Sequence, residues 1–138
     1  MTGKQYFQRA LDAERRVRAL QDQIAHIEDM ALRRPGMSAS GIRAASGNHS
    51  ALESAVVRLL DTERKLSDQL DEYNKLIEEA RGVIERIGDE KMQHVLRLRY
   101  LSGMRWEEIA PRIGYTLRQT FRLHGLALRA AERILGLR

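Results

Sequence analysis

The sequence predicts an all-α protein, and three observations support this fold class. Apolar residues make up 43% of the chain but aromatic residues only 5%, a balance that favours helices packed through Leu, Ile and Ala over a sheet. The 138 residues include only two prolines. Apolar residues also recur at alternating spacings of four and three, as in coiled coils. We expect a long antiparallel helical hairpin over residues 1–87, followed by a C-terminal helix-turn-helix over residues 88–138.

The first long helix is predicted from Thr2 to Arg34. Thr2 and Gln5 have the spacing of a capping box, and Pro35-Gly36 ends the helix. The apolar positions between these signals form an uninterrupted heptad seam that consists of Tyr6, Ala10, Ala13, Val17, Leu20, Ile24, Ile27 and Ala31. Seven-residue periodicity over this length predicts coiled-coil packing.

Residues 35–50 are rich in Gly and Ser and are expected to form a loop at the tip of the hairpin. Arg33, Arg34 and Arg43 make this tip basic. A second nucleic-acid contact is one interpretation, and a solvated loop is the favoured one.

The second long helix is predicted to begin at the capping box of Ser50 and Glu53. Its heptad seam consists of Leu52, Val56, Leu59, Glu63, Leu66, Leu70, Tyr73, Ile77, Ala80, Ile84 and Ile87. Leu60, Leu76 and Val83 flank the seam and widen the apolar stripe. A stripe this wide indicates a further helix or a second subunit.

A shorter helix is predicted from about Glu90 to Ser102. Gly88 ends the preceding helix, and Asp89 is a suitable N-cap for this one. Gly103 is a plausible residue for the left-handed position that follows a helix.

Residues Trp106 to Leu128 predict two helices joined by a tight turn at Gly114. Thr116 and Gln119 form the capping box of the second helix, which is expected to continue to Leu135. Arg118, Gln119 and Arg122 are expected to face outward on its first turns. Arg can pair with guanine and Gln with adenine in the major groove, so this pattern predicts a DNA-binding unit. Two packed helices with a solvated basic face are the structural alternative.

The stretch from Val95 to Gly114 resembles region 4 of bacterial sigma factors. The C-terminal third is similar to small phage proteins, some uncharacterised and others late-gene transcription regulators of the ArpU and RinA type. The shared pieces are Arg99-Tyr100, Trp106 to Ala110, Gly114-Tyr115, Arg118-Gln119, His124-Gly125 and Ala127-Leu128. The resemblance implies that Leu117, Arg118, Phe121 and Arg122 touch bases. Together with the capping pair, the expected DNA-binding residues are Thr116, Leu117, Arg118, Gln119, Phe121 and Arg122.

The net charge of +5 is unevenly distributed. Residues 88–138 hold ten basic and five acidic side chains, whereas residues 51–87 hold six basic and nine acidic ones. A polyanionic partner is therefore expected to bind the C-terminal part.

Several classes of protein are not expected. There is no cysteine, which excludes disulfides and thiolate metal sites and suits a reducing cytoplasm. The four histidines lack ligand-like spacing, so no metal site is expected, and no phosphate loop or nucleophile motif indicates an enzyme or a cofactor. No apolar run approaches the roughly 18 to 20 residues that cross a bilayer, so no membrane association is expected.

These observations predict a sequence-specific DNA-binding transcription regulator of phage or prophage genes. The hairpin would mediate dimerisation or contact with RNA polymerase, so the expected partners are double-stranded DNA, the polymerase and a second copy, a dimer being favoured. A phage DNA-packaging protein of the terminase small subunit type is an alternative, which ring-like oligomers would indicate. An interaction module that binds only protein is another, which a lack of DNA binding would indicate.

Overall fold

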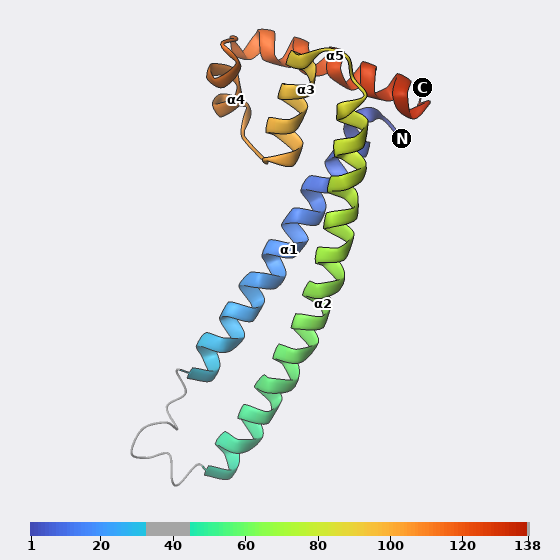
Figure 1. Cartoon of the computed structure of the whole chain (residues 1–138). Coiled ribbons are helices and arrows are strands. Elements are labelled where there is room, and N and C mark those ends of the chain that lie inside the picture. The colour runs from blue at the N-terminus through green and yellow to red at the C-terminus, as the bar shows by residue number, and fades with distance from the viewer. Residues whose placement is uncertain (33–44, 138) are drawn as a thin grey trace. The chain divides into compact units, whose positions relative to one another are not determined.

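The structure is a computed structural model that describes residues 1–32 and 45–137. Within these ranges every regular element is helical and no strand occurs, which confirms the all-α class (Figure 1). The elements are α1 (Gly3–Leu32), α2 (Ala45–Glu85), α3 (Glu90–Leu96), the π-helical segment η3 (Arg97–Leu101), α4 (Trp106–Ile113) and α5 (Leu117–Leu135).

The chain forms two compact units. The first unit comprises Met1–Glu14 and Glu72–Arg138, and the second unit comprises Arg15–Asp71. Helices α1 and α2 both run through the two units, so each unit contains one segment of each helix. The division between residues 87 and 88 that the sequence suggests stays a prediction.

Helix α1 begins where its capping box predicts. Thr2 Oγ1 accepts a hydrogen bond from the Gln5 backbone N–H at 3.1 Å, and Gln5 Oε1 accepts one from the Thr2 N–H at 2.8 Å. These bonds satisfy donors that the start of a helix otherwise leaves unpaired. The predicted end at Arg34 lies outside the described residues.

Helix α2 begins at Ala45, before the start that the Ser50–Glu53 capping box predicted. The loop predicted over residues 35–50 is therefore wrong for residues 45–50, which are helical, and its other residues lie outside the described part of the chain. A capping box marks a position where a helix can begin without preventing an earlier start. One Gly within a helix, here Gly47, costs only about 1 kcal/mol relative to Ala.

In the second unit the buried face of α2 is rotated from the predicted heptad seam. Thr62 is buried, whereas Glu63 and Leu70 are exposed, so their predicted seam positions are wrong. On this adjacent face, Arg16 Nε on α1 donates a hydrogen bond to Gln69 Oε1 on α2 at 2.9 Å. An apolar pattern alone did not distinguish these two neighbouring faces.

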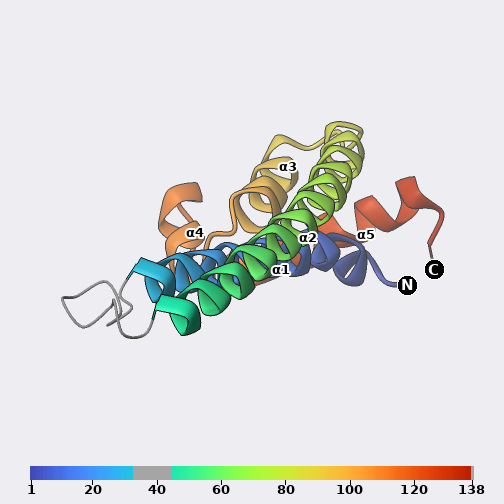
Figure 2. The same cartoon turned by 90° about the horizontal axis from the view of Figure 1, so that it is seen from below.

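The core of the first unit draws on all six helical segments. Its buried residues are Phe7, Leu11, Ala80, Val83, Ile84, Ile87, Val95, Leu96, Leu98, Tyr100, Ile109, Leu123, Ala127 and Ala131. Full burial of a large apolar side chain stabilises a fold by about 1.5–3 kcal/mol. Within this unit α3, α4 and α5 pack against one another (Figure 1 and Figure 2).

Phe7 is a core residue of α1 that the heptad seam did not include. Its side chain is fully buried, and its ring stacks on Tyr100 with centroids 5.2 Å apart. Leu11, one turn later, is buried in the same core. These positions lie beside the seam because α1 also packs against the C-terminal helices in this unit, which gives it a second buried face.

The helix predicted over Glu90–Ser102 changes type along its length. Asp89 caps it as predicted, and its Oδ1 accepts a hydrogen bond from the Met92 N–H at 2.9 Å. The second part, η3, is π-helical, and the Ser102 N–H donates to the Arg97 carbonyl five residues earlier at 2.9 Å. Gly103 follows with φ +66°, as a left-handed residue after a helix.

Candidate nucleic-acid interface

Helix α4 begins at an N-cap, Arg105, whose side chain has no hydrogen-bond acceptor. Only the reciprocal half of a capping box can therefore form. Glu108 Oε1 accepts hydrogen bonds from the Arg105 N–H at 3.4 Å and from its Nε at 3.0 Å. The bond from the Arg105 side chain lowers the pKa of Glu108 below its usual value. Pro111 lies within α4 on its exposed side, and the helix continues past it to Ile113.

The turn between α4 and α5 requires a glycine. Gly114 has φ +75° and ψ 28°, the left-handed conformation that side chains with a Cβ rarely adopt. The Tyr115 N–H donates to the Ala110 carbonyl at 2.9 Å, and the Gly114 N–H donates to the Pro111 carbonyl at 3.2 Å. These bonds close the end of α4 and set the direction in which α5 leaves the turn.

Thr116 and Gln119 form the capping box that the sequence predicted for α5. Thr116 Oγ1 accepts from the Gln119 N–H at 3.1 Å, and Gln119 Oε1 accepts from the Thr116 N–H at 3.0 Å. The amide oxygen of Gln119 is thus engaged within the chain. Because paired recognition of adenine uses both the oxygen and the nitrogen of the amide, Gln119 is better placed to cap α5 than to bind a base.

The other four expected site residues lie together on the exposed face of α5. Leu117 and Phe121 are one turn apart and are 43% and 49% exposed, and we call them the apolar row. Arg118 and Arg122 are also exposed and one turn apart, and we call them the basic row. The two rows lie next to each other over the first two turns of α5.

The opposite face of α5 is buried and includes a polar residue, His124. Its Nε2 lies 2.8 Å from the Tyr100 hydroxyl. Burial lowers the pKa of His124 to about 4, and the charges of Lys4 and Arg99 act in the same direction. Burial also raises the pKa of Tyr100 to about 12, against the opposing effect of Arg99. Both side chains are therefore uncharged at neutral pH, and each satisfies the other.

Trp106 packs against Phe121, one of the two residues of the apolar row. Its ring contacts Phe121 edge-on with centroids 5.4 Å apart, and its centroid lies 4.5 Å from that of His124. The Arg99 guanidinium lies 4.7 Å from the centre of the Trp106 ring and donates a hydrogen bond to the Met104 carbonyl at 3.0 Å. The exposed Phe121 ring is thus held by a second aromatic ring that is itself fixed.

The residues that support this face, Tyr100, Trp106 and His124, were not among the site residues predicted from the sequence. Thr120, His124 and Ala127 follow one another at helical spacings of four and three, which is a signal for an inward stripe. A histidine within such a stripe needs a buried partner. The sequence contained this requirement but not the identity of the partner.

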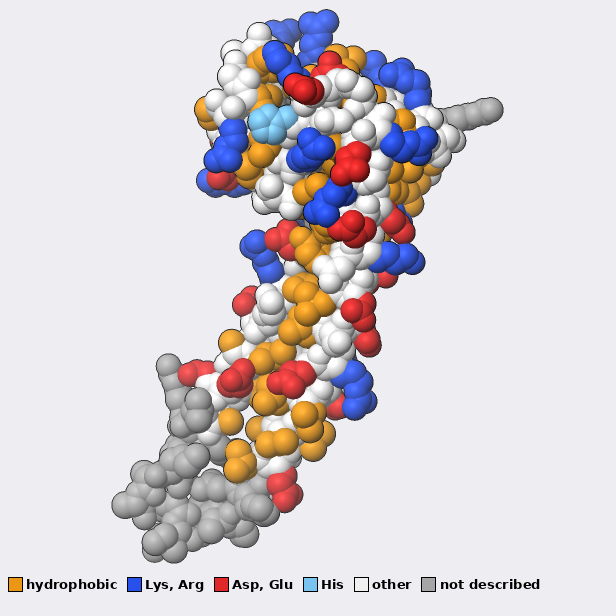
Figure 3. Space-filling model, in the orientation of Figure 1, with side chains coloured by type: hydrophobic (Ala, Val, Ile, Leu, Met, Phe, Trp, Pro, Cys, Tyr) orange, Lys and Arg blue, Asp and Glu red, His pale blue; other side chains and the backbone are white. Residues whose placement is uncertain are grey.

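Basic side chains continue along α5 beyond the two rows. Arg129 and Arg133 are exposed and lie about three and four turns after the helix begins. Figure 3 shows Lys and Arg side chains gathered over the end of the first unit that α3, α4 and α5 form. This surface also carries acidic residues, because Glu107 and Glu108 are exposed on α4.

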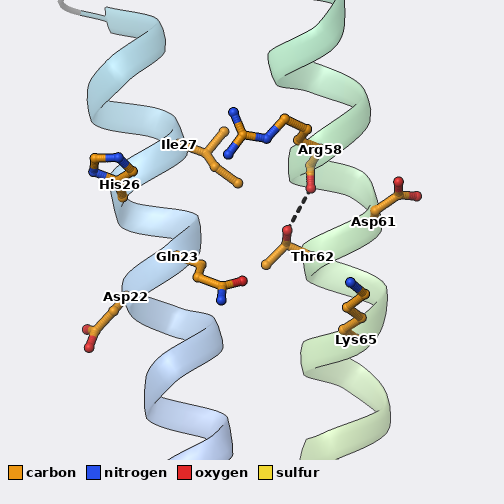
Figure 4. A pocket seen from close by; sticks show the side chains of 8 residues that line it. All are labelled: Asp22, Gln23, His26, Ile27, Arg58, Asp61, Thr62 and Lys65. Atoms are coloured by element: carbon orange, nitrogen blue, oxygen red, sulfur yellow. Dashed lines mark hydrogen bonds between the residues drawn. The ribbon is translucent and has the colours of Figure 1, made fainter.

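The second unit contains a polar hollow of about 450 Å³ between α1 and α2 (Figure 4). Gln23, Ile27 and Arg58 point into the space between the helices, whereas Asp61 points away (Figure 4). Thr62 Oγ1 donates a hydrogen bond to the Arg58 carbonyl at 2.7 Å. Side chains of both charges border the hollow, among them Asp22, Arg58 and Lys65.

In the part of the chain that the structure describes, no group of three or more His, Asp or Glu side chains is placed to hold a metal ion. Nor does any helix among residues 1–32 and 45–137 combine the length and apolar character needed to cross a membrane.

Comparison of the chain with protein-family models, with curated proteins and with solved structures gave no match. The geometry of α4 and α5 is therefore the basis for assigning a function.

Proposed function

We propose that the protein is a sequence-specific DNA-binding transcription regulator of phage or prophage genes. In this proposal α4, the Gly114 turn and α5 act as a helix-turn-helix similar to region 4 of sigma factors. The observation that carries the proposal is the pair of rows on the first two turns of α5. A recognition helix presents these turns to base edges, where hydrogen-bonding groups and methyl groups lie side by side.

The dimensions of α5 suit this role. Its 19 residues give a length of about 28 Å, and an α-helix fits the major groove, which is about 12 Å wide. Arg118 and Arg122 would donate paired hydrogen bonds to guanine. Arg129 and Arg133 lie further along the helix, where backbone phosphates are the expected contacts.

Competition binding by the full chain tests this assignment. The protein first selects duplexes from a random pool, and each variant then competes against single-base changes of the selected duplex. Arg118→Ala or Arg122→Ala should cost about 1–3 kcal/mol on the selected duplex and flatten the preference at particular base pairs. Arg129→Ala should weaken binding to all sequences about equally.

Arg64→Ala provides the matched control, because Arg64 is an exposed arginine of α2 in the second unit. It should change neither affinity nor preference. An even loss of affinity across the duplexes for both Arg118→Ala and Arg122→Ala would contradict base recognition by the basic row. Failure of the protein to enrich any duplex would contradict DNA recognition altogether and would favour a module that binds only protein.

We further propose that α1 and α2 form one antiparallel hairpin that mediates dimerisation or contact with RNA polymerase. The exposed apolar side chains of α2 favour dimerisation. Leu52, Val56, Val57 and Leu60 are between 42% and 57% exposed. Apolar side chains that lie one turn apart along a helix suit a second helical hairpin as partner. A ring-like oligomer would instead favour a DNA-packaging role of the terminase small subunit type.

The proposed mode of action is binding alone. In this proposal the protein is cytoplasmic and uses no cofactor, metal ion or catalytic step. The lack of cysteine in the sequence is compatible with a reducing compartment. The DNA-binding face and the apolar side chains of α2 would then be the two working surfaces of the chain.

A further inference from the structure

The apolar row lies beside arginines on the exposed face of α5. Leu117 and Phe121 remain 43% and 49% exposed next to Arg118 and Arg122, whereas Leu123 on the opposite face of the helix is buried. Leu126, later in α5, is exposed as well. Leaving an apolar side chain in water forgoes part of the free energy that full burial supplies. The row therefore has apolar surface available to a ligand that also presents groups to the two arginines.

We propose that the apolar row binds the 5-methyl group of a pyrimidine in the major groove, next to a guanine bound by the basic row. This inference rests on the proposed DNA-binding function and specifies the chemical group that it recognises. The 5-methyl group is the apolar group that base edges present in the major groove. Thymine supplies it in ordinary DNA, and 5-methylcytosine supplies the same group in methylated DNA.

The support beneath Phe121 strengthens this assignment. Phe121 rests edge-on against Trp106, and Trp106 in turn contacts His124 and Arg99. A ring that is already held in place loses little conformational freedom when a ligand binds, so more of the contact energy contributes to affinity. Phe121 thus provides a fixed apolar surface. Its proposed contact with DNA can be tested by removing a single methyl group from a base.

The geometry of α5 places this contact beside the guanine contact. The two residues of each row are one helical turn apart, and both rows lie at the start of α5. The rows occupy adjacent faces of the helix. Side chains in adjacent rows of a recognition helix reach neighbouring base pairs. The proposed target is therefore a duplex in which a methylated pyrimidine and a guanine lie close together.

The test replaces each dT of a duplex selected by the full chain with dU, which removes only the methyl group. Burial of one methylene-sized group contributes about 0.8 kcal/mol, which corresponds to about a 4-fold change in affinity. We expect that loss at one or two positions near a guanine. Comparison of dC with 5-methyl-dC at the same positions distinguishes the sources. Higher affinity for dT than for dU, without higher affinity for 5-methyl-dC than for dC, identifies thymine as the recognised base. Higher affinity for the methylated base in both comparisons identifies the methyl group itself.

The protein variants connect this effect to the apolar row. Phe121→Ala should reduce the dT to dU ratio to about 1, and Phe121→Leu should retain part of it. Arg118→Ala is the matched control, because it should weaken binding to both duplexes while it preserves their ratio. Helicity and melting temperature of each variant, measured without DNA, verify that the fold is intact.

The outcomes for this inference and for the proposed function are distinct. Selective DNA binding that is equally strong with dT and dU at every position overturns the inference alone. A methyl effect that persists in both Phe121→Ala and Leu117→Ala also overturns it, because another part of the chain would then sense the methyl group. The absence of any selective DNA binding overturns the proposed function and the inference together.

Discussion

The Tyr100 hydroxyl and His124 Nε2 lie 2.8 Å apart inside the first unit, and this contact joins η3 to the buried face of α5. The two rings are tilted with centroids 5.7 Å apart, and His124 also contacts Trp106. Behind the face of α5 that carries the apolar and basic rows there is thus a buried polar contact between two side chains. The Tyr100 hydroxyl is the hydrogen-bond partner of the buried His124 ring.

Tyr100→Phe should destabilise the protein by about 1–3 kcal/mol. The substitution keeps the ring that stacks on Phe7 but leaves a buried nitrogen of His124 without its partner, and an unsatisfied buried polar group costs about this much. Urea unfolding followed by circular dichroism measures the loss. The double variant Tyr100→Phe/His124→Leu should recover part of it, because neither partner then remains unpaired. Equal stability of wild type and Tyr100→Phe would contradict a role for the contact.

Stability should fall as the pH decreases from about 6.5 towards about 4. The folded-state pKa of His124, about 4, lies below its ordinary value of 6.5, so in this window the unfolded chain binds a proton that the folded chain does not. The contribution lost by His124 is at most about 3 kcal/mol. Free energies of unfolding measured at several pH values between 6.5 and 4 give this loss of stability. His124→Leu is the control, because its free energy of unfolding should lack the pH dependence that His124 causes. Parallel pH profiles of both proteins would refute the assignment.

Two glycine substitutions should have opposite effects on stability. Gly114→Ala should destabilise by about 1–2 kcal/mol, since Gly114 has φ +75° and a Cβ is disfavoured in that conformation. Gly125→Ala should stabilise by about 0.5–1 kcal/mol, because Gly125 lies within α5 and a Cβ there meets no other atom within 4 Å. Thermal unfolding of both variants tests the pair. A stable Gly114→Ala variant would show that the turn tolerates another backbone conformation.

Two apolar positions of the predicted α2 seam should differ in their importance. Ile84 is fully buried in the first unit, so Ile84→Ala should cost about 2–5 kcal/mol. Leu70 is 36% exposed in the second unit, so Leu70→Ala should cost clearly less. Equilibrium unfolding of the two variants compares them directly. Similar losses would indicate that Leu70 is covered in solution, which a partner subunit could explain.

The exposed apolar side chains of α2 lead to a prediction about the oligomeric state of the protein in solution. Leu60 is 56% exposed, so Leu60→Asp should leave the folded chain intact but dissociate a dimer that uses this surface. Gel filtration with light scattering should show a dimer for wild type and a monomer for the variant. Glu63→Asp, a change at an exposed position on the same helix that keeps the charge, should leave the mass unchanged. A wild-type monomer would remove the support for dimerisation.

The sequence by itself determined the all-α class and several helix ends. The capping boxes of Thr2 with Gln5 and of Thr116 with Gln119 form as predicted, as do the Asp89 cap and the turn at Gly114. Each of these features depends on residues within a few positions of one another. Caps and tight turns depend only on residues that are close in the sequence, so they can be predicted from a single sequence.

Only the tertiary structure decided which neighbouring faces pack and which buried groups meet. Thr62 is buried in place of Glu63, and Phe7 enters the core from outside the heptad seam. The partnership of Tyr100 with His124 joins residues 24 positions apart. Helical periodicity shows that a face is apolar but not which other helix covers it. That choice depends on shape and polar pairing between segments distant in the chain, and those exist only once the helices pack together.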